Sequence, residues 1–317
     1  MPARPQSERV KPPALRPGDN IGIVAPASYF NREDFENGCA ALRKMGYTPV
    51  FDENIFERDL YFAGGTARRV RELESMFLRD DIKAIICARG GYGSNYLLPN
   101  LDLKKISAKP KAFIGYSDLT SLQTYFCDAA NMVTFHGPMV SKDFAKPDGV
   151  DVESWLAALS GRDNWMLGFD SGSGVKPLVQ GSAEGVLYGG CLSILVASLG
   201  TPYEIRTDGT IFFIEDVATK PYQIDRMLMH LKLAGKLDGI RGIIFGEMLD
   251  CFQTHEQGYT LEEIVMRVVG DLGVPIAYGL RSGHVSRQNI TLPIGVDVLL
   301  NVGGSGVSLE ILEPATV

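Results

Sequence analysis

The first half of the chain alternates short apolar runs with longer stretches in which apolar residues recur every three or four positions. Spacing such as that of Phe35, Cys39 and Leu42 indicates amphipathic helices. The apolar runs between them predict strands at residues 20–25, 48–51, 84–87, 112–114 and 133–135. Strands that alternate with helices pair in parallel, because each connection has to cross back over the sheet. The first half is therefore predicted to form a Rossmann-like parallel α/β domain with helices on both faces of its sheet.

The first of these helices has recognisable ends. Asn31 is a favourable N-cap residue, and Asp34 follows three positions later. Gly46 comes just after the last apolar residue of the stretch, Met45, and can adopt the left-handed backbone that closes a helix. The sequence therefore predicts a helix between Asn31 and Gly46.

From about residue 142 the pattern changes. One short helix around Trp155 stands among Asp, Gly, Ser and Pro residues, which is typical of an interdomain connection. Beyond it, two helices are predicted, one beginning at Pro221 and one capped by Thr260 with Glu263. Strands dominate the rest and are predicted at residues 211–214, 242–245, 290–293 and 296–302.

The chain of 317 residues is long enough for two hydrophobic cores. The predicted organisation is a flexible N-terminus (1–17), an N-terminal α/β domain (18–145), a linker (146–178) and a strand-rich α+β C-terminal domain (179–317). A cleft between the two domains is the expected place for an active site.

The composition limits the partners that the protein can have. With 31 basic and 38 acidic side chains the net charge is −7, so nucleic-acid phosphates and anionic lipids are repelled. Residues 1–17 lack the apolar run of a signal peptide, and no run approaches the roughly 20 apolar residues that span a bilayer. The five cysteines are odd in number and widely spaced, which favours a reducing cytoplasm over a disulfide framework. Neither nucleic acid nor a membrane is expected as a partner.

The sharpest local feature is the segment at residues 112–120. An apolar strand ends at Gly115, Ser117 stands at the apex of the turn, and a helix begins at once. This is the layout of a nucleophile elbow, in which the hydroxyl is exposed above the sheet and the helix N-terminus faces a developing oxyanion. Ser117 could instead simply cap the helix, and Leu119 stands where a hydrolase elbow usually has its second glycine.

A glycine-rich turn at residues 89–93 follows the strand at 84–87. Its small residues would let backbone N–H groups approach a ligand, as an oxyanion hole requires. The turn lacks the Lys-Ser/Thr of a P-loop and the G-x-G-x-x-G spacing of a dinucleotide site, so nucleotide binding has little support. A plain turn is the alternative interpretation.

Four histidines are available as a general base. His230 falls within a helix on a mostly apolar stripe and is predicted to pack, and His255 lies in a polar loop and is predicted to be solvated. His136 and His284 lie in loops near strand ends. Either of these two could face a cleft, and either could be a hydrogen-bonded structural residue.

The acidic pair Glu215-Asp216 ends a fully apolar strand. A triad needs its orienting carboxylate at such a place, although a salt bridge or an N-cap would have the same pattern. The order Ser117, Glu215, His284 is the chain order of α/β-hydrolase triads. No H-x-x-x-H or H-x-E cluster occurs, so neither a metal site nor a cofactor is predicted.

Together these segments resemble the LD-carboxypeptidase family, which includes murein tetrapeptide carboxypeptidases and microcin C self-immunity peptidases. The matching stretches run in order along the chain, at residues 15–19, 24–28, 89–93, 115–120, 136–138, 184–190, 213–217, 222–227, 283–284 and 292–295. The resemblance implies that Ser117 is the nucleophile, His284 the general base and Glu215 the orienting acid. It also implies an oxyanion hole formed by the backbone N–H groups of Asp118 and Gly91.

One position departs from the family pattern. After Gly189-Gly190 the family often has an Asn that contacts substrate, whereas this chain has Cys191. Cys191 could also be a nucleophile, because a thiol at the start of a helix can have a lowered pKa. The resemblance makes His136 a structural residue beside the site. The other candidate substrate contacts are Tyr92 and three arginines that could bind the terminal carboxylate, namely Arg89, Arg281 and Arg287.

The resemblance implies a cytoplasmic serine carboxypeptidase without a cofactor. Its expected reaction is hydrolysis of the L,D-peptide bond to a C-terminal D-alanine in peptidoglycan-derived tetrapeptides, as in cell-wall recycling. One alternative is a self-immunity peptidase for microcin-like peptidyl nucleotides, and another is a non-catalytic binding protein for a small solute. We expect a small peptide as the ligand and a homodimer as the assembly.

Overall fold

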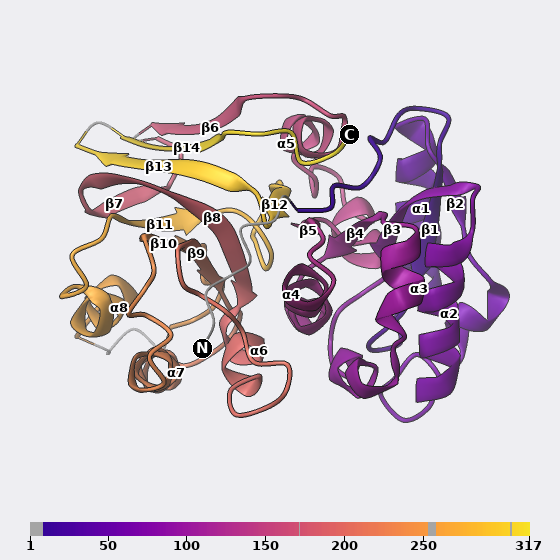
Figure 1. Cartoon of the computed structure of the whole chain (residues 1–317), viewed down its shortest axis with the longest axis horizontal. Helices are drawn as coiled ribbons and strands as arrows, with labels where there is room; N and C mark the ends of the chain where they lie inside the picture. Colours follow the sequence, from indigo (N-terminus) through magenta and orange to yellow (C-terminus); the bar gives the residue numbers. More distant parts are fainter. Residues whose placement is uncertain (1–8, 171, 253–257, 305) are drawn as a thin grey trace. The chain divides into compact units, whose positions relative to one another are not determined.

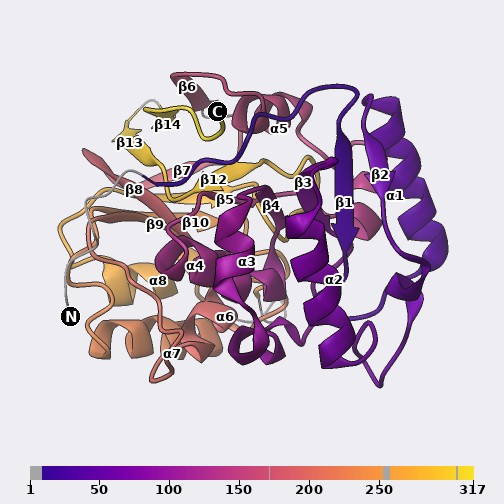
Figure 2. The ribbon, with the colours of Figure 1, turned by 45° about the vertical axis from the view of Figure 1, so that its right-hand side comes forward.

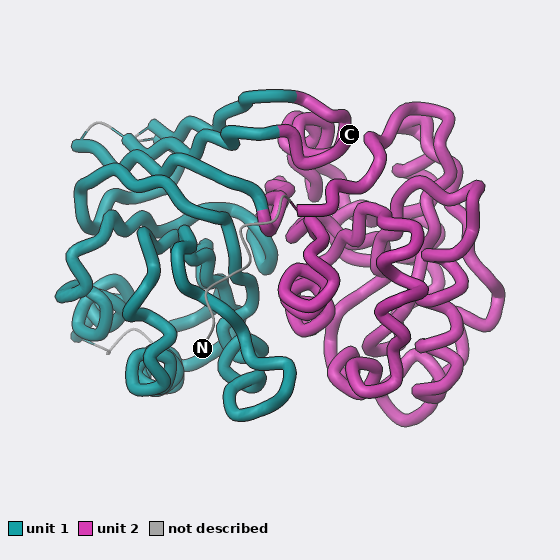
Figure 3. Tube along the Cα trace, in the orientation of Figure 1, with its two compact units in different colours: residues 1–8, 163–286, 296–313 teal, residues 9–162, 287–295, 314–317 magenta. Residues whose placement is uncertain are grey.

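The computed structural model describes residues 9–170, 172–252, 258–304 and 306–317. These residues divide into two compact units (Figure 3). Unit 2 comprises residues 9–162, 287–295 and 314–317, and unit 1 comprises residues 163–286 and 296–313. Each unit is therefore built from segments that lie far apart in the sequence.

A six-stranded sheet forms the centre of unit 2, in the order β12-β5-β4-β3-β1-β2 (Figure 1). Its strands β1 to β5 are parallel, and β12 runs antiparallel to β5 at one edge. All five strands predicted in the first half are present, and the parallel α/β fold is confirmed. The bounds are β1 (Asn20–Val24), β2 (Thr48–Val50), β3 (Ile82–Cys87), β4 (Ala112–Gly115), β5 (Thr134–His136) and β12 (Leu292–Ile294).

Helices cover both faces of this sheet (Figure 2). Because crossover connections are right-handed, the strand order puts α1 on one face and α2, α3 and α4 on the other. Every residue of β4 is buried, as expected for a strand covered on both sides. The helices are α1 (Arg32–Lys44), α2 (Thr66–Leu78), α3 (Leu103–Ala108), α4 (Thr120–Ala129) and α5 (Val152–Leu159), with short helical turns at Glu53–Phe56, Ser94–Tyr96, Leu98–Asn100, Ser117–Leu119 and Val140–Phe144.

The predicted ends of the first helix are confirmed. Asn31 Oδ1 accepts hydrogen bonds from Glu33 N at 2.7 Å and Asp34 N at 3.2 Å, which satisfies two of the free N–H groups at the start of α1. Gly46, just beyond the end of α1, has φ +91°, a left-handed conformation that suits glycine.

Unit 1 is built on an eight-stranded mixed sheet in the order β6-β14-β13-β8-β9-β10-β11-β7. Strands β8 to β11 are parallel, and the other pairings are antiparallel. The sheet curls enough that β7 also comes near β13 and β14. The strands are β6 (Trp165–Asp170), β7 (Lys176–Val179), β8 (Gly181–Cys191), β9 (Thr210–Glu215), β10 (Gly242–Gly246), β11 (Ile276–Leu280), β13 (Asp297–Gly303) and β14 (Gly306–Ile311), and the helices are α6 (Leu192–Ala197), α7 (Pro221–Leu233) and α8 (Leu261–Val269).

Both helices predicted in this half are present. Pro221 is the first residue of α7, and the Thr260 hydroxyl accepts a hydrogen bond from Glu263 N at 3.2 Å at the start of α8. The strand expected at residues 290–293 was assigned to the wrong sheet, because β12 pairs with β5 in unit 2. Strands β6 and β7 lie in the stretch that looked like a connection, since their alternation is interrupted by glycine and proline.

Two further findings concern membrane-spanning helices and the cysteines. No helix in the ranges that the structure describes is long and apolar enough to cross a bilayer. All five cysteines are buried as thiols rather than half-cystines.

Candidate active site

Ser117 stands where β4 gives way to α4. The strand ends at Gly115, and a single helical turn, Ser117–Leu119, leads directly into α4 at Thr120. Ser117 has φ +66°, a left-handed backbone that costs a non-glycine residue roughly 1–3 kcal/mol. The surroundings hold the serine in this strained conformation, as in a nucleophile elbow.

The alternative that Ser117 merely caps a helix is wrong. The N-cap of the turn is Tyr116, the N-cap of α4 is Leu119, and neither end has a side-chain cap hydrogen bond. A left-handed backbone also differs from the extended one that N-cap residues adopt. The serine therefore has no capping role that would explain its position.

Buried polar contacts fix the elbow on both sides. Asp118, which is 2% exposed, accepts a hydrogen bond from Ser94 N at 2.7 Å through its side chain. The Ser94 hydroxyl donates to the backbone oxygen of Asp118 at 2.6 Å. On the strand side, Gln123 Nε2 donates to the carbonyl oxygens of Gly115 at 2.8 Å and Phe135 at 2.6 Å. Burial raises the pKa of Asp118, against the hydrogen bonds from Ser94 that favour its charged form.

The glycine-rich turn at residues 89–93 lies against the serine. A Cβ on Gly90 would stand 2.8 Å from Ser117 Cβ and 3.1 Å from its Oγ, and a Cβ on Gly91 would stand 2.5 Å from Ser28 Oγ. Gly91 also has φ +103°, which a side chain would strain. Only glycine fits both places, and the backbone of the turn at Gly90 therefore lies close to the Ser117 side chain. Tyr92 N and the Ser28 hydroxyl secure the turn through a hydrogen bond of 3.1 Å.

Arg69, a buried arginine that the sequence analysis did not single out, stabilises the turn at residues 89–93. Arg69 is fully buried, and its Nη1 donates to the carbonyl oxygens of Pro26 at 2.7 Å and Gly93 at 2.8 Å. Its Nε donates to Gly64 O at 3.2 Å, and its guanidinium lies 4.6 Å from the centre of the Phe62 ring. Burial lowers the pKa of Arg69. One cation thus ties together the loop after β1, the loop after β3 and the segment just before α2.

The neighbouring residue of α2 forms a second buried contact. Arg68 Nη1 lies 2.6 Å from Glu72 Oε1, and Glu72 Oε2 accepts a hydrogen bond from Ala25 N at 2.8 Å. Burial raises the pKa of Glu72 to about 7, more than its pairing with Arg68 lowers it. An arginine on a helix is normally exposed, so the sequence does not indicate that Arg68 and Arg69 face inward.

In unit 1, Glu215 and His284 form a hydrogen-bonded pair. Glu215 is the last residue of β9 and is fully buried, and its Oε2 lies 2.8 Å from His284 Nδ1. The same oxygen accepts a hydrogen bond from His284 N at 3.0 Å. Gly246 makes room for the carboxylate, because a Cβ there would stand 2.6 Å from Glu215 Cβ. A carboxylate facing Nδ1 favours a proton on that nitrogen and leaves Nε2 as the basic one.

The adjacent Asp216 has different partners. Its Oδ2 accepts a hydrogen bond from Ser193 N at 2.9 Å, and its Oδ1 accepts from Val217 N at 2.8 Å and from the Thr219 hydroxyl at 2.9 Å. Burial raises the pKa of Asp216. These bonds organise the start of α6 and the turn after β9, as expected of a structural carboxylate.

Cys191 lies beside the Glu–His pair. It is the last residue of β8, directly opposite Glu215 in the parallel register, and it is 4% exposed. One ligand atom each of Cys191, Glu215 and His284 lies within 4.8 Å of the others. Burial, together with the carboxylates of Glu215 and Asp216, raises the pKa of the thiol well above its usual range. This is the opposite of the lowered pKa on which the interpretation of Cys191 as a nucleophile depended.

The candidate substrate contacts are dispersed. Arg89 is exposed and donates to Tyr29 O at 2.9 Å, and Tyr92 is 42% exposed. Tyr92 lies in a group of aromatic rings with Tyr61, Phe62 and Tyr96. Arg281 is half-buried in unit 1, and Arg287 is exposed in unit 2.

The other histidines are weaker candidates for the general base. His136 is fully buried at the end of β5, with its ring centre 5.9 Å from that of Tyr116. His230 was predicted to pack but is exposed, because it lies on the outer side of α7 next to the buried positions Leu228 and Leu231. His255 lies outside the described residues.

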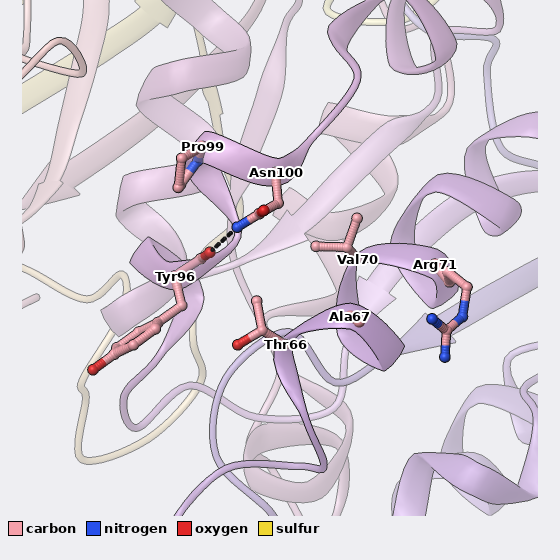
Figure 4. A pocket seen from close by; sticks show the side chains of 7 residues that line it. All are labelled: Thr66, Ala67, Val70, Arg71, Tyr96, Pro99 and Asn100. Atoms are coloured by element: carbon pink, nitrogen blue, oxygen red, sulfur yellow. Dashed lines mark hydrogen bonds between the residues drawn. The ribbon is translucent and has the colours of Figure 1, made fainter.

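Unit 2 has a surface pocket that is separate from the set of predicted site residues. It opens between the start of α2 and the turns at residues 94–100, where Asn100 Nδ2 donates to Tyr96 O at 3.0 Å (Figure 4). It is lined by Thr66, Ala67, Val70, Arg71, Tyr96, Pro99 and Asn100. No predicted site residue is among them.

The fold and these residues define the class of protein. It is a two-domain α/β protein in which one unit carries a serine at a strained strand-to-helix turn and the other carries a hydrogen-bonded Glu–His pair. Serine hydrolases use this set of groups.

Comparison with known proteins identifies the family. Residues 21–137 match the LD-carboxypeptidase N-terminal domain, and residues 184–300 match the LD-carboxypeptidase C-terminal domain. The chain is 35% identical over 301 residues to the probable murein peptide carboxypeptidase of Bacillus subtilis (strain 168), which covers 95% of this chain and 94% of that protein. This protein belongs to the LD-carboxypeptidase family, a family of serine peptidases. The resemblance predicted from the sequence is confirmed.

Solved structures agree with this assignment. The muramoyltetrapeptide carboxypeptidase from Oxalobacter formigenes is similar with a TM-score of 0.84 and 27% identity, covering 93% of this chain and 99% of that one. MccF in complex with glutamyl sulfamoyl guanosine is similar with a TM-score of 0.88 and 25% identity, covering 97% of this chain and 99% of that one.

Proposed function

We propose that this protein is a serine carboxypeptidase that cleaves the L,D-peptide bond to a C-terminal D-alanine in peptidoglycan-derived tetrapeptides. The observation that carries the proposal is the left-handed backbone of Ser117 at a strand-to-helix turn, which has no capping role to explain it. Because the chain belongs to a serine peptidase family, we interpret this turn as the one that presents the nucleophile.

In the proposed reaction, Ser117 Oγ attacks the peptide carbonyl while His284 Nε2 takes the hydroxyl proton. Glu215 holds the imidazole through Nδ1 and stabilises the imidazolium that forms. The N–H groups of Asp118 and Gly91 are proposed to stabilise the oxyanion. The imidazolium then gives its proton to the departing D-alanine amine, and water hydrolyses the acyl-enzyme with the same histidine as base. This mechanism requires the serine hydroxyl and the imidazole to meet during turnover.

The domain roles follow from this proposal. We assign the nucleophile to the N-terminal domain and the acid and base to the C-terminal domain. The predicted bounds, 18–145, 146–178 and 179–317, differ from those of the compact units, because β6 and β7 belong to the sheet of unit 1 and β12 to the sheet of unit 2. We further propose a cytoplasmic location, which the five cysteine thiols suit, and a homodimeric assembly. Arg89, Tyr92, Cys191, Arg281 and Arg287 stay our candidates for substrate contacts.

The second candidate function is cleavage of microcin-like peptidyl nucleotides. It is favoured by the TM-score of 0.88 with MccF in complex with glutamyl sulfamoyl guanosine. Sequence identity favours the murein substrate, since it is 35% with the probable murein peptide carboxypeptidase and 28% with the microcin C7 self-immunity protein MccF of Escherichia coli.

A comparison of two substrates tests this proposal. The purified protein is incubated with a muropeptide tetrapeptide and, separately, with glutamyl sulfamoyl adenosine, and the products are followed by mass spectrometry. Release of free D-alanine at a kcat/KM well above that for the nucleotide supports the murein function. Preferential cleavage of the nucleotide supports the second candidate, and binding without cleavage of either would make the protein a solute-binding protein.

A further inference from the structure

Three side chains of the kinds that bind soft divalent metals converge in unit 1. One ligand atom each of Cys191, Glu215 and His284 lies within 4.8 Å of the other two, and all three belong to the same unit. Their spacing in the sequence, 24 residues from Cys191 to Glu215 and 69 from Glu215 to His284, hides this cluster from any motif search. Strand pairing creates it, because Cys191 is the register partner of Glu215 at the ends of β8 and β9.

The distances suit a tetrahedral zinc site. Zinc binds cysteine sulfur at about 2.3 Å, and histidine nitrogen and carboxylate oxygen at about 2.0–2.2 Å. Tetrahedral angles then separate the ligand atoms by roughly 3.3–3.8 Å. The three atoms are already gathered to within 4.8 Å, so rotamer adjustments of about 1 Å would complete three bonds. His284 is half-buried, so solvent can supply the fourth ligand.

Charge balance also favours a dication here. Glu215 is fully buried and Cys191 is 4% exposed, so the thiol can lose its proton here only when a cation balances the two negative charges. A divalent cation bound by one carboxylate, one thiolate and one neutral imidazole makes a site with no net charge.

We propose that Cys191, Glu215 and His284 form an inhibitory site for Zn²⁺ and similar soft divalent cations. The thiol proton passes to solvent as the metal–sulfur bond forms. The imidazole proton moves from Nδ1 to Nε2 when Nδ1 becomes the ligand in place of its hydrogen bond to Glu215. Nε2 then carries a proton and cannot act as a base, so metal binding and peptide hydrolysis exclude each other. Metal binding stands independently of the proposed function, and only the inhibition rests on it.

The binding test uses Cd²⁺ as the probe, because cadmium–thiolate bonds absorb in the ultraviolet. We expect a thiolate band that saturates at one Cd²⁺ per chain in the wild-type protein. Cys191→Ala and Cys191→Ser should lose the band, and the Kd for Zn²⁺ measured by calorimetry should rise by more than about 100-fold, since even outer contacts of a metal site contribute 10–100-fold. Cys39→Ala is the matched control, because Cys39 is another buried cysteine but lies on α1 in unit 2. Melting curves of each variant show whether it is folded.

The outcomes separate this proposal from the proposed function. A wild-type protein that gives no band, or a Cys191→Ser protein that is folded and keeps the wild-type band, overturns the metal site. If the protein hydrolyses tetrapeptide and Zn²⁺ inhibits wild type and Cys191→Ser equally, the inhibition acts elsewhere and the proposal is also wrong. If Cd²⁺ binds through Cys191 but no substrate is ever cleaved, the site stands and the proposed peptidase function fails.

Discussion

Replacement of Arg69 by methionine tests how the glycine-rich turn at residues 89–93 is held in place. Methionine keeps most of the apolar stem but removes the donors to three carbonyl oxygens, those of Pro26, Gly64 and Gly93. Each buried carbonyl left without a donor costs about 1–3 kcal/mol, and part of this is offset because a desolvated cation disappears. We expect a net loss of about 3–5 kcal/mol in the free energy of unfolding.

The same substitution should also slow catalysis. Gly93 and Gly90 belong to one short turn, and the backbone at Gly90 lies against Ser117, the proposed nucleophile. Displacement of a catalytic group by about 1 Å can cost about 100-fold in rate, so kcat should fall by roughly 10- to 100-fold with a smaller change in KM.

Urea denaturation and steady-state release of D-alanine measure the two effects. Arg71→Met is the matched control, since Arg71 lies on the same helix two residues further on but is exposed, and its stability should change by no more than about 0.5 kcal/mol. If Arg69→Met and Arg71→Met have the same urea midpoint and the same kcat, the role assigned to Arg69 is wrong.

Three further predictions concern single residues. Glu215→Gln should lower kcat by about 10³- to 10⁴-fold, because an amide favours the wrong imidazole tautomer, whereas Asp216→Asn should chiefly lower the melting temperature; the reverse pattern would reassign the acid. Gly90→Ala should lower kcat at least tenfold while Gly65→Ala, whose Cβ would meet nothing within 4 Å, should not, and equal rates would contradict the close packing at the turn. Glu72 has a pKa of about 7 in the folded protein against 4.5 for an unperturbed carboxyl, so the folded state holds its proton more tightly. Its contribution to stability is therefore full below about pH 4.5 and is lost as the pH rises through 7, and Glu72→Gln should flatten that part of a stability–pH curve measured by urea denaturation.

The parallel α/β half was predicted well from the sequence, because the local spacing of its apolar residues indicates where its strands and helices lie. The sequence analysis did not predict β8, a strand of eleven residues with four glycines, because glycine weakens the strand pattern. In the structure these glycines allow close approach, and a Cβ on Gly189 would clash with the Phe213 carbonyl. It also placed β12 in the wrong sheet, because strand spacing carries no information on which distant strand is the partner.

The residues of the candidate site also differ in how well they could be predicted from the sequence. The strand-to-helix turn at Ser117 was readable because it is local, and the partnership of His284 with Glu215 rather than Asp216 needed the resemblance to a family. Two features could not be predicted from the sequence. One is the inward orientation of Arg69, which depends on loops from three parts of the chain, and the other is the position of Cys191 opposite Glu215, which depends on strand register.

The central claim is that His284 and Glu215 activate Ser117. Diisopropyl fluorophosphate reacts with serines activated in this way and leaves an adduct that peptide mass spectrometry can locate. The account predicts a single adduct on Ser117 in the wild-type protein and none in His284→Ala, measured on proteins with matching melting curves. An adduct on another residue, or full modification of Ser117 in His284→Ala, would contradict it.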